Sequence, residues 1–148
     1  MIRKMVLSHD STNDVLQDTY IRIYKGIDNF KEKSKLSTWI YRIAYNESIR
    51  FLNRESKMKK IELDSKDENY SKKLFADTFF DADNLSLKFH QILSELSVRQ
   101  RNIFNMKYFD ELKFEEISKI TDLNINTVKS VYYSVEKKIK KEINESSL

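Results

Sequence analysis

The chain contains no cysteine and no proline, and Gly26 is its only glycine. Without cysteine there is no disulfide, no thiolate metal ligand and no cysteine nucleophile, which fits a reducing cytoplasm. Tight β-turns depend on glycine and proline, so their near absence disfavours sheets and favours helices joined by polar loops. No apolar run approaches the roughly 18 residues of a membrane span. The sequence therefore predicts an all-α, soluble protein of the cytoplasm.

Charge is distributed unevenly along the 148 residues. Residues 1–60 hold 13 Lys/Arg against 7 Asp/Glu (+6), residues 61–86 hold 3 against 7 (−4), and residues 87–148 hold 11 against 9 (+2). Two basic segments around an acidic one indicate two units that face nucleic acid. Helical periodicity is also lost across the acidic segment. We predict two small helical domains, residues 1–58 and 87–148, joined by a flexible acidic linker over residues 59–86.

The stretch from Ser37 to Arg54 has apolar residues at helical spacing and a basic polar side. Aromatic and basic side chains beside an apolar seam are typical of a nucleic-acid surface. An ordinary bundle helix with a solvated basic edge has the same pattern, so this stretch alone leaves both interpretations open. Its polar side consists of Arg42, Asn46, Arg50, Asn53 and Arg54.

The loop before this helix alternates cations with aromatic rings. The residues concerned are Phe30, Lys31, Lys33, Lys35 and Trp39. A loop of this kind can hold phosphates and stack unpaired bases. Phe30 and Trp39 also fit as core anchors, and both roles remain open.

A helix is predicted from about Asn13 to Ile27, with Leu16, Tyr20, Ile23 and Ile27 forming its core-facing stripe. The opposite face is polar and contains one exposed isoleucine. That face suits the docking of a protein partner. It also suits a solvated surface with acidic residues near the helix N-terminus. Its residues are Asp14, Gln17, Asp18, Ile21 and Arg22.

The C-terminal domain has the pattern of a helix-turn-helix. Ser97 is predicted to cap a helix from about Val98 to Tyr108, and two further helices are predicted at Phe114–Thr121 and Asn124–Lys141, with Asn124 as the N-cap. The first turns of the last helix would enter the major groove. Helical hairpins are also common in proteins that do not bind DNA. The groove-facing candidates are Asn126, Thr127, Lys129, Ser130 and Tyr133.

The sequence contains no motif that is typical of a catalytic site. The two histidines, His9 and His90, lie in different domains without metal-ligand spacing, and a single glycine excludes a glycine-rich phosphate loop. Glu115 and Glu116 are adjacent and diverge on a helix, so they do not form a general acid–base pair. We therefore predict no catalytic residues, no metal site, no cofactor and no enzyme activity.

With both halves considered, the chain resembles a bacterial RNA polymerase sigma factor of the extracytoplasmic-function type, group 4 of the sigma-70 family. The first half is similar to region 2 through Asp14–Tyr24, Phe30 and Ser37–Asn46. The second half is similar to region 4 through Leu93–Arg101, Met106–Tyr108, Phe114–Ser118 and Asn126–Ser130. The resemblance covers nearly the whole chain. It implies a factor that binds core RNA polymerase, directs it to promoters and helps to melt the −10 element, while the polymerase supplies the catalysis.

The resemblance assigns roles to three groups of residues. The β′ clamp helices of the polymerase would be bound by Asp14, Gln17, Asp18, Ile21 and Arg22. The −10 element would be bound by Phe30, Lys31, Lys33, Lys35, Ser37, Trp39, Arg42, Asn46, Arg50 and Arg54, with one base flipped out at an unstacking cost of a few kcal/mol. The −35 element would be bound by Arg101, Asn126, Thr127, Lys129, Ser130 and Tyr133. The first helices of the C-terminal domain would also contact the β flap, and an anti-sigma factor is a further expected partner.

The sequence departs from the family pattern at several positions. Arg50 stands where the family commonly has Asp, and Val131, Ser134 and Glu136 stand where Arg is usual in the recognition helix. Fewer cations there predict weaker or altered −35 binding. The family also usually has residues before Met1, so we expect the first helix to be incomplete. Three alternatives remain: a sigma-like adaptor recruited by a DNA-bound protein, a DNA-binding regulator that acts without polymerase, and a purely structural helical protein.

Overall fold

The computed structural model describes residues 1–56, 63–66, 70–75 and 84–146. The described chain is helical and contains an isolated antiparallel bridge between Lys66 and Ser97 but no strand. The all-α prediction is therefore confirmed for this part of the chain. The helices are α1 (Ile2–Val6), α2 (His9–Gly26), the 3-10 turn η1 (Ile27–Asn29), α3 (Leu36–Glu55), α4 (Tyr70–Phe75), α5 (Asn84–Ser94), α6 (Val98–Tyr108), α7 (Phe114–Thr121) and α8 (Ile125–Ser146).

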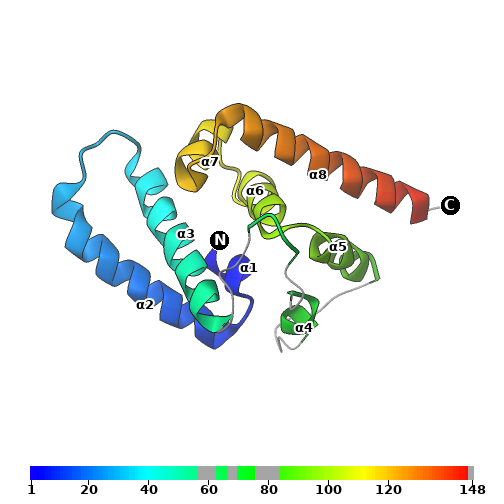
Figure 1. The fold of residues 1–148 in the computed structure, drawn as a ribbon, viewed down its shortest axis with the longest axis horizontal. Coiled ribbons are helices and arrows are strands. Elements are labelled where there is room, and N and C mark those ends of the chain that lie inside the picture. The colour runs from blue at the N-terminus through cyan, green and yellow to red at the C-terminus, as the bar shows by residue number, and fades with distance from the viewer. Residues whose placement is uncertain (57–62, 67–69, 76–83, 147–148) are drawn as a thin grey trace.

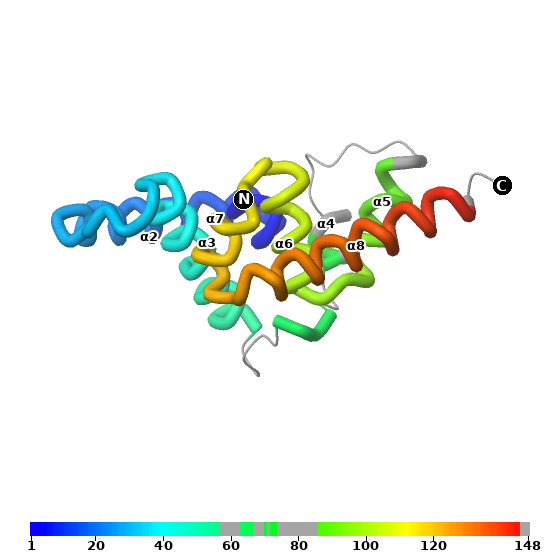
Figure 2. The backbone as a smooth tube through the Cα atoms, turned by 90° about the horizontal axis from the view of Figure 1, so that it is seen from above, coloured from blue at the N-terminus to red at the C-terminus, as the bar shows by residue number. Residues whose placement is uncertain are grey.

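Helices α2 and α3 form a hairpin, and α1 packs against both of them (Figure 1). Helix α8 runs along α6 and α7, and α7 lies beside α3, so the two halves of the chain are in contact. The loop end of the α2–α3 hairpin and the C-terminal end of α8 lie at opposite ends of the molecule (Figures 1 and 2). Among the described helices, none is long and apolar enough to cross a membrane.

One apolar core runs through both halves. Its buried members come from α1, α2 and α3 on one side and from α6, α7 and α8 on the other, and they are Ile2, Met5, Val6, Val15, Ala44, Tyr45, Ile103, Met106, Ile117, Ile120 and Val128. Ile103, Ile117 and Val128 are completely inaccessible to solvent. The predicted domains thus share buried apolar surface, and burial of this kind is the main favourable contribution to folding.

The predicted core stripe of α2 is wrong at two positions. Tyr20 is 65% exposed and Ile27 is 39% exposed, whereas Val15 and Thr19 are the buried residues of the helix. The Thr19 hydroxyl donates a hydrogen bond to the Val15 carbonyl (2.7 Å), so this polar side chain is buried without an unsatisfied group. The helix therefore buries smaller side chains than predicted, and Tyr20, Ile21, Tyr24 and Ile27 remain exposed.

The predicted start of α6 is confirmed. The Ser97 side chain accepts a hydrogen bond from the Gln100 backbone N–H (3.2 Å), and the Gln100 side chain accepts one from the Ser97 N–H (3.0 Å). This reciprocal pair is a capping box, and it satisfies two donors that a helix end otherwise leaves without partners. The local sequence therefore determines where the helix begins.

Replacing Ser97 with alanine is expected to lower the free energy of unfolding by about 1 kcal/mol, because the Gln100 N–H loses its acceptor. Urea denaturation followed by circular dichroism measures the change. Ser134→Ala is the matched control at an exposed position of α8, and a change below about 0.5 kcal/mol is expected there. Equal losses in the two variants would contradict the capping role of Ser97.

Of the predicted linker, residues 59–62, 67–69 and 76–83 lie outside the described residues. The described parts contact both halves: Lys73 Nζ of α4 lies 2.8 Å from Glu55 Oε2 of α3, and the other contacts are with the C-terminal half. The backbone N–H groups of Val98 and Arg99 donate to the carbonyls of Ser65 (3.2 Å) and Leu63 (2.7 Å). Tyr70, the first residue of α4, is only 3% exposed. Residues 63–66 and Tyr70 therefore pack against the structure around the start of α6.

Candidate functional site

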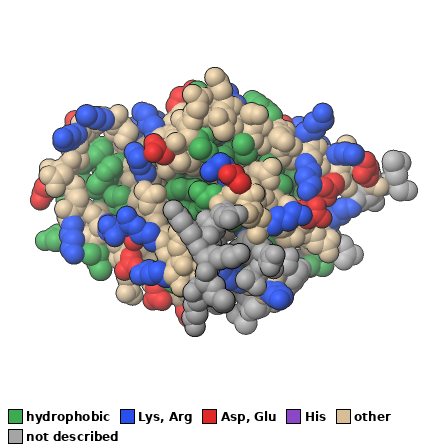
Figure 3. Space-filling view, viewed as in Figure 1, with side chains coloured by type: hydrophobic (Ala, Val, Ile, Leu, Met, Phe, Trp, Pro, Cys, Tyr) green, Lys and Arg blue, Asp and Glu red, His purple; other side chains and the backbone are tan. Residues whose placement is uncertain are grey.

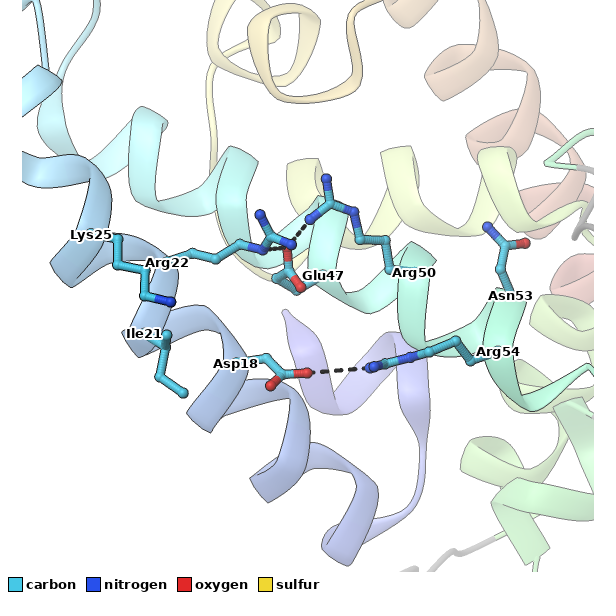
Figure 4. Close-up of a pocket in the computed structure, with 8 residues that line it drawn as sticks. All are labelled: Asp18, Ile21, Arg22, Lys25, Glu47, Arg50, Asn53 and Arg54. Carbon is cyan, nitrogen blue, oxygen red and sulfur yellow. Dashed lines mark hydrogen bonds and ion pairs between the residues drawn. The ribbon is translucent and has the colours of Figure 1, made fainter.

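A charged pocket of about 520 Å³ lies between α2 and α3 (Figure 4). Both helices contribute polar residues to it, and the lining consists of Asp18, Ile21, Arg22, Lys25, Glu47, Arg50, Asn53 and Arg54. Four of these side chains are basic and two are acidic. The family resemblance assigned Asp18, Ile21 and Arg22 to polymerase binding and Arg50 and Arg54 to DNA binding. The structure brings these two groups together in one pocket.

Glu47 is the centre of this pocket. It is 5% exposed, and one oxygen of its carboxylate pairs with both Arg22 Nε and Arg50 Nη1, the latter at 2.5 Å (Figure 4). Each arginine side chain is 53% exposed. A buried carboxylate is tolerated when it is paired and hydrogen-bonded, so the two arginines compensate the charge of Glu47 while their outer surfaces remain open to solvent.

A second pocket, of about 490 Å³, adjoins the first and shares Asp18 and Arg54 with it. Arg54 Nη2 lies 3.2 Å from Asp18 Oδ2 and links the two helices. Asp14 and Gln17 line the second pocket with Phe51 and Glu55. All five predicted clamp-binding residues therefore lie along one polar surface of the α2–α3 hairpin.

The aromatic pair at the hairpin loop packs against α2. The ring centroids of Phe30 and Trp39 are 5.3 Å apart with the planes tilted at 44°. A Cβ atom added at Gly26 would lie 3.2 Å from Cζ2 of Trp39, so the only glycine of the chain allows the indole to approach the end of α2. Both rings are half-buried, which supports each of the two roles left open by the sequence.

The exposed side of α3 carries several of the candidate DNA-binding residues. Arg42, Asn46 and Arg50 are exposed at i, i+4 and i+8, and Trp39 precedes them on the same side. Lys31, Lys33 and Ser37 are exposed at and after the loop. On the face seen in Figure 3, several basic side chains lie at the end of the molecule formed by α2 and α3, among hydrophobic and a few acidic side chains. The arrangement is a cationic surface with aromatic rings at one end.

Two of these cations are paired with acidic residues of the C-terminal half. Lys35 Nζ lies 3.4 Å from Glu116 Oε1, and Arg42 Nη2 lies 3.7 Å from Asp122 Oδ1. The pKa of Glu116 lies below its ordinary value, chiefly because the Lys113 backbone N–H donates to its carboxylate (2.9 Å). Burial opposes this shift, and the Lys35 ammonium adds to it. Glu116 is therefore a stable anion next to Lys35 at neutral pH.

The same side of the hairpin contacts α6. Tyr45 of α3 is 6% exposed, and burial raises the pKa of its hydroxyl. The charge of Arg99 and a hydrogen bond with Asn102, both on α6, act in the opposite direction. Tyr45 is therefore a neutral, buried contact between the two halves.

The helix-turn-helix prediction agrees with the structure. Helix α7 has the predicted bounds, and α8 begins at Ile125. The Asn124 side chain accepts a hydrogen bond from the Asn126 N–H (2.8 Å), as expected for an N-cap. The turn contains Asp122 in the left-handed conformation (φ 60°). The α8 candidates are all exposed: Asn126, Thr127, Lys129, Ser130 and Tyr133.

The structure contradicts an exposed role for Arg101. This residue is 3% exposed, its guanidinium lies 3.8 Å from the ring centroid of Tyr70, and Nη1 lies 3.5 Å from the Leu93 carbonyl oxygen. Burial against a residue of the predicted linker keeps it away from the surface. Arg101 is therefore not part of the DNA-contacting set that the geometry supports.

Sequence reasoning missed Glu47, Glu116 and Asp122. Glu47 is an acidic residue in an otherwise basic stretch of α3, and that contrast is a signal for a paired carboxylate. Nothing in the local sequence indicates that Glu116 and Asp122 lie next to α3. Within the described residues, no cluster of His, Asp and Glu side chains could hold a metal ion.

Comparison with known proteins identifies the family. Residues 1–58 match the family described as Sigma-70 region 2, and residues 86–139 match Sigma-70, region 4. The chain is 27% identical to the RNA polymerase sigma factor SigV of Bacillus subtilis (strain 168), over 97% of the chain and 82% of SigV. It is 26% identical to the ECF RNA polymerase sigma factor SigW of the same organism, over 96% of the chain and 80% of SigW. The chain therefore belongs to the sigma-70 family, as a transcription initiation factor of the extracytoplasmic-function type.

Solved structures share the fold at lower identity. The sigma factor RpoE in complex with the anti-sigma factor NepR from Bartonella quintana superposes with a TM-score of 0.66, at 21% identity over 97% of this chain and 87% of RpoE. CnrH in complex with the cytosolic domain of CnrY gives 0.64, at 17% identity over 97% of this chain and 78% of CnrH. The arrangement of helices in this chain is thus also found in these two solved structures.

Proposed function

We propose that this chain binds core RNA polymerase through the polar surface of the α2–α3 hairpin and opens promoters at the −10 element. The observation that carries the proposal is the Phe30–Trp39 pair, 5.3 Å apart, at the head of the exposed basic side of α3. Aromatic rings stack on unpaired bases and cations hold the backbone. Residues 1–58 would act as the −10 unit and residues 87–148 as the −35 unit, with residues 59–86 between them.

The clamp helices of the β′ subunit are the proposed partner of the α2–α3 pockets. Asp14, Gln17 and Asp18 supply acceptors there, and the exposed Ile21 (51%) supplies an apolar contact. The β flap is the proposed partner of the C-terminal half. An apolar pocket of about 320 Å³ between α5, α6 and α8, lined in part by Phe89, Phe104 and Ile139, supports this assignment.

Base capture is the proposed mechanism of promoter melting. Extruding a base costs a few kcal/mol, and stacking on an aromatic side chain recovers about 1–3 kcal/mol per base. Lys31, Lys33 and Ser37 are exposed around the rings and can contact the phosphates on either side of the flipped base. The chain would supply binding energy only, and the polymerase would supply the catalysis. The site of action would be the cytoplasm, with the polymerase.

Run-off transcription with purified core polymerase tests the proposed function. Start sites that depend on the chain are expected on a random promoter library, and a Trp39→Phe variant should retain more open-complex formation than Trp39→Ala. Core polymerase pull-down is the accompanying measurement. Absence of core binding would refute the proposal.

The second candidate function is a sigma-like adaptor that a DNA-bound protein recruits. One observation favours it: the exposed first turns of α8 carry a single cation, Lys129, among five candidate residues, and Glu136 further along pairs with Lys140 (3.2 Å). Few cations give little phosphate neutralisation. Core binding without promoter selection, restored by a partner protein, would support the adaptor.

Lys129→Ala is expected to weaken promoter binding by the polymerase-bound factor and to reduce the slope of log affinity against log salt by about 1, because one phosphate contact is lost. Filter binding over a series of salt concentrations measures the slope. Lys137→Ala, also exposed on α8 but three turns from its start, is the matched control and should leave the slope unchanged. If the parent chain, Lys129→Ala and Lys137→Ala all gave the same salt-dependence slope, Lys129 at the start of α8 would not contact DNA.

An anti-sigma factor is a further proposed partner. Of the two similar folds described above, the sigma factor RpoE was solved as a complex with the anti-sigma factor NepR, and CnrH was solved with the cytosolic domain of CnrY. Identification of the partner requires capture from cells that express the chain at its natural level.

A further inference from the structure

A pocket of about 240 Å³ lies between α1, α4, α5 and α6. These four helices lie below α8 in the view of Figure 1. Among the described residues, the lining of this pocket has no member in common with the two pockets of the α2–α3 hairpin or with the apolar pocket beside α8. It is therefore a separate cavity, for which neither polymerase nor DNA is proposed as the occupant.

Apolar side chains form the walls of this pocket. Leu7, Tyr70 and Leu93 are 6%, 3% and 2% exposed and belong to one buried cluster. Phe109 also lines the pocket and is 43% exposed, so the pocket has a buried side and a side that is open to solvent. An apolar cavity of about 150 Å³ can hold benzene. The larger pocket therefore has room for one substituted benzene ring.

One buried polar group in this pocket lacks a hydrogen-bond partner. Asn105 of α6 is 6% exposed and contributes to the lining. Its Oδ1 atom has no hydrogen-bond partner within the described part of the chain. A buried acceptor without a partner is costly and uncommon in native proteins. A ligand that donates a hydrogen bond to this amide would remove the cost.

The charged residues that line the pocket are basic. Arg3 and Lys4 of α1 contribute cations, and the described lining residues include no acidic side chain. Lys4 already pairs with Asp110 (3.5 Å). The Arg3 guanidinium donates to the Leu7 carbonyl, but its five N–H donors allow it to bind a carboxylate as well. Burial lowers the pKa of His90, which also lines the pocket and is neutral at pH 7. The charge thus favours an anionic ligand with Arg3 as its main partner.

We propose that this pocket is a binding site for a small aromatic carboxylate that carries a hydroxyl group. The ring would lie against the apolar walls, the carboxylate would bind Arg3, and the hydroxyl would donate a hydrogen bond to Asn105. Such a ligand would contact helices from both halves of the chain. Its binding would therefore stabilise the folded chain to an extent that grows with ligand concentration.

Nuclear magnetic resonance titration of the whole chain tests the proposal. The probe is 4-hydroxybenzoate, compared with benzoate, which lacks the donor, and 4-hydroxybenzyl alcohol, which lacks the charge. Shifts of backbone amide signals are expected at the pocket residues of α1, α5 and α6. We expect a dissociation constant of about 1 mM or lower for 4-hydroxybenzoate. Benzoate should bind about fivefold more weakly and the alcohol at least about tenfold more weakly.

Three results of this titration would overturn the proposal. Shifts confined to the α2–α3 hairpin would show that the anion only neutralises surface cations. Equal affinities for the three probes would show that the pocket distinguishes neither the donor nor the charge. Absence of binding up to about 10 mM would show that the cavity does not accept this class of ligand.

Two variants assign the contacts. Arg3→Gln should weaken the binding of both carboxylates about tenfold but leave the binding of 4-hydroxybenzyl alcohol unchanged. Asn105→Leu, which keeps the size of the side chain, should remove the preference for 4-hydroxybenzoate over benzoate. Lys137→Gln, at an exposed position of α8, is the control and should change none of the affinities. An equal loss for all three probes in Arg3→Gln would overturn the assignment of the carboxylate.

Circular dichroism establishes whether each variant is folded. If a variant does not fold, the comparison of the three probes on the parent chain still supports or overturns the proposed site. These measurements use neither polymerase nor DNA, so their outcome is independent of the proposed function.

Discussion

The double substitution Arg22→Met/Arg50→Met is expected to lower the free energy of unfolding by about 3–5 kcal/mol, the cost of leaving a buried charge without its partner. Both arginines bind the carboxylate of Glu47, which is 5% exposed. Methionine preserves much of the side-chain length and packing but not the charge. Urea denaturation at neutral pH measures the loss.

The triple variant Arg22→Met/Arg50→Met/Glu47→Met separates charge from packing. Replacing a complete buried ion group with apolar residues is often neutral or stabilising, so most of the lost stability should return. A triple variant as unstable as the double one would show that side-chain packing, and not the uncompensated carboxylate, causes the loss. Single arginine substitutions should have smaller effects, because the remaining arginine still pairs with Glu47.

Ile103→Ala is expected to lower the free energy of unfolding by about 2–5 kcal/mol, through lost apolar contacts and the cavity that remains. Ile103 lies on α6, is completely inaccessible to solvent, and belongs to the cluster shared by both halves of the chain. Because the halves share this cluster, the whole described structure should unfold in one transition. Thermal denaturation followed by circular dichroism measures both the loss and the number of transitions.

Ile21→Ala is the matched control for that substitution. Ile21 is 51% exposed on α2, and surface substitutions of this kind usually change stability by less than about 0.5 kcal/mol. Two separate thermal transitions, only one of which shifts to lower temperature in Ile103→Ala, would show that the two halves fold independently.

Local sequence was sufficient where short-range contacts decide the structure. Ser97 and Asn124 were recognised as caps because the capping group and its backbone partner lie within three residues of each other. The bounds of α7, Phe114–Thr121, were also predicted from the local sequence. The exposed start of α8 was predicted correctly as well, since a helix whose buried stripe is known also has a known exposed side.

Long-range packing explains the errors. The face that α2 buries depends on the helices packed against it, α1 and α3, and in the structure Thr19 is buried whereas Tyr20 is exposed. The family resemblance placed Arg101 at the −35 element, yet Tyr70 covers it from a segment about thirty residues earlier in the chain. Lys35 and Glu116 are 81 residues apart in the chain. A local sequence pattern does not predict a contact between residues so far apart.

Trp39 is the only tryptophan of the chain, and it lies against Phe30 and Gly26 at the closed end of the hairpin. Indole emission from this protein therefore originates at a single place, the pair of rings proposed to receive a base. Stacking of a nucleobase on that indole would quench the emission. Tryptophan fluorescence of the unmodified chain should therefore report when a base enters the loop. No label is needed, and no second tryptophan of this chain contributes to the signal.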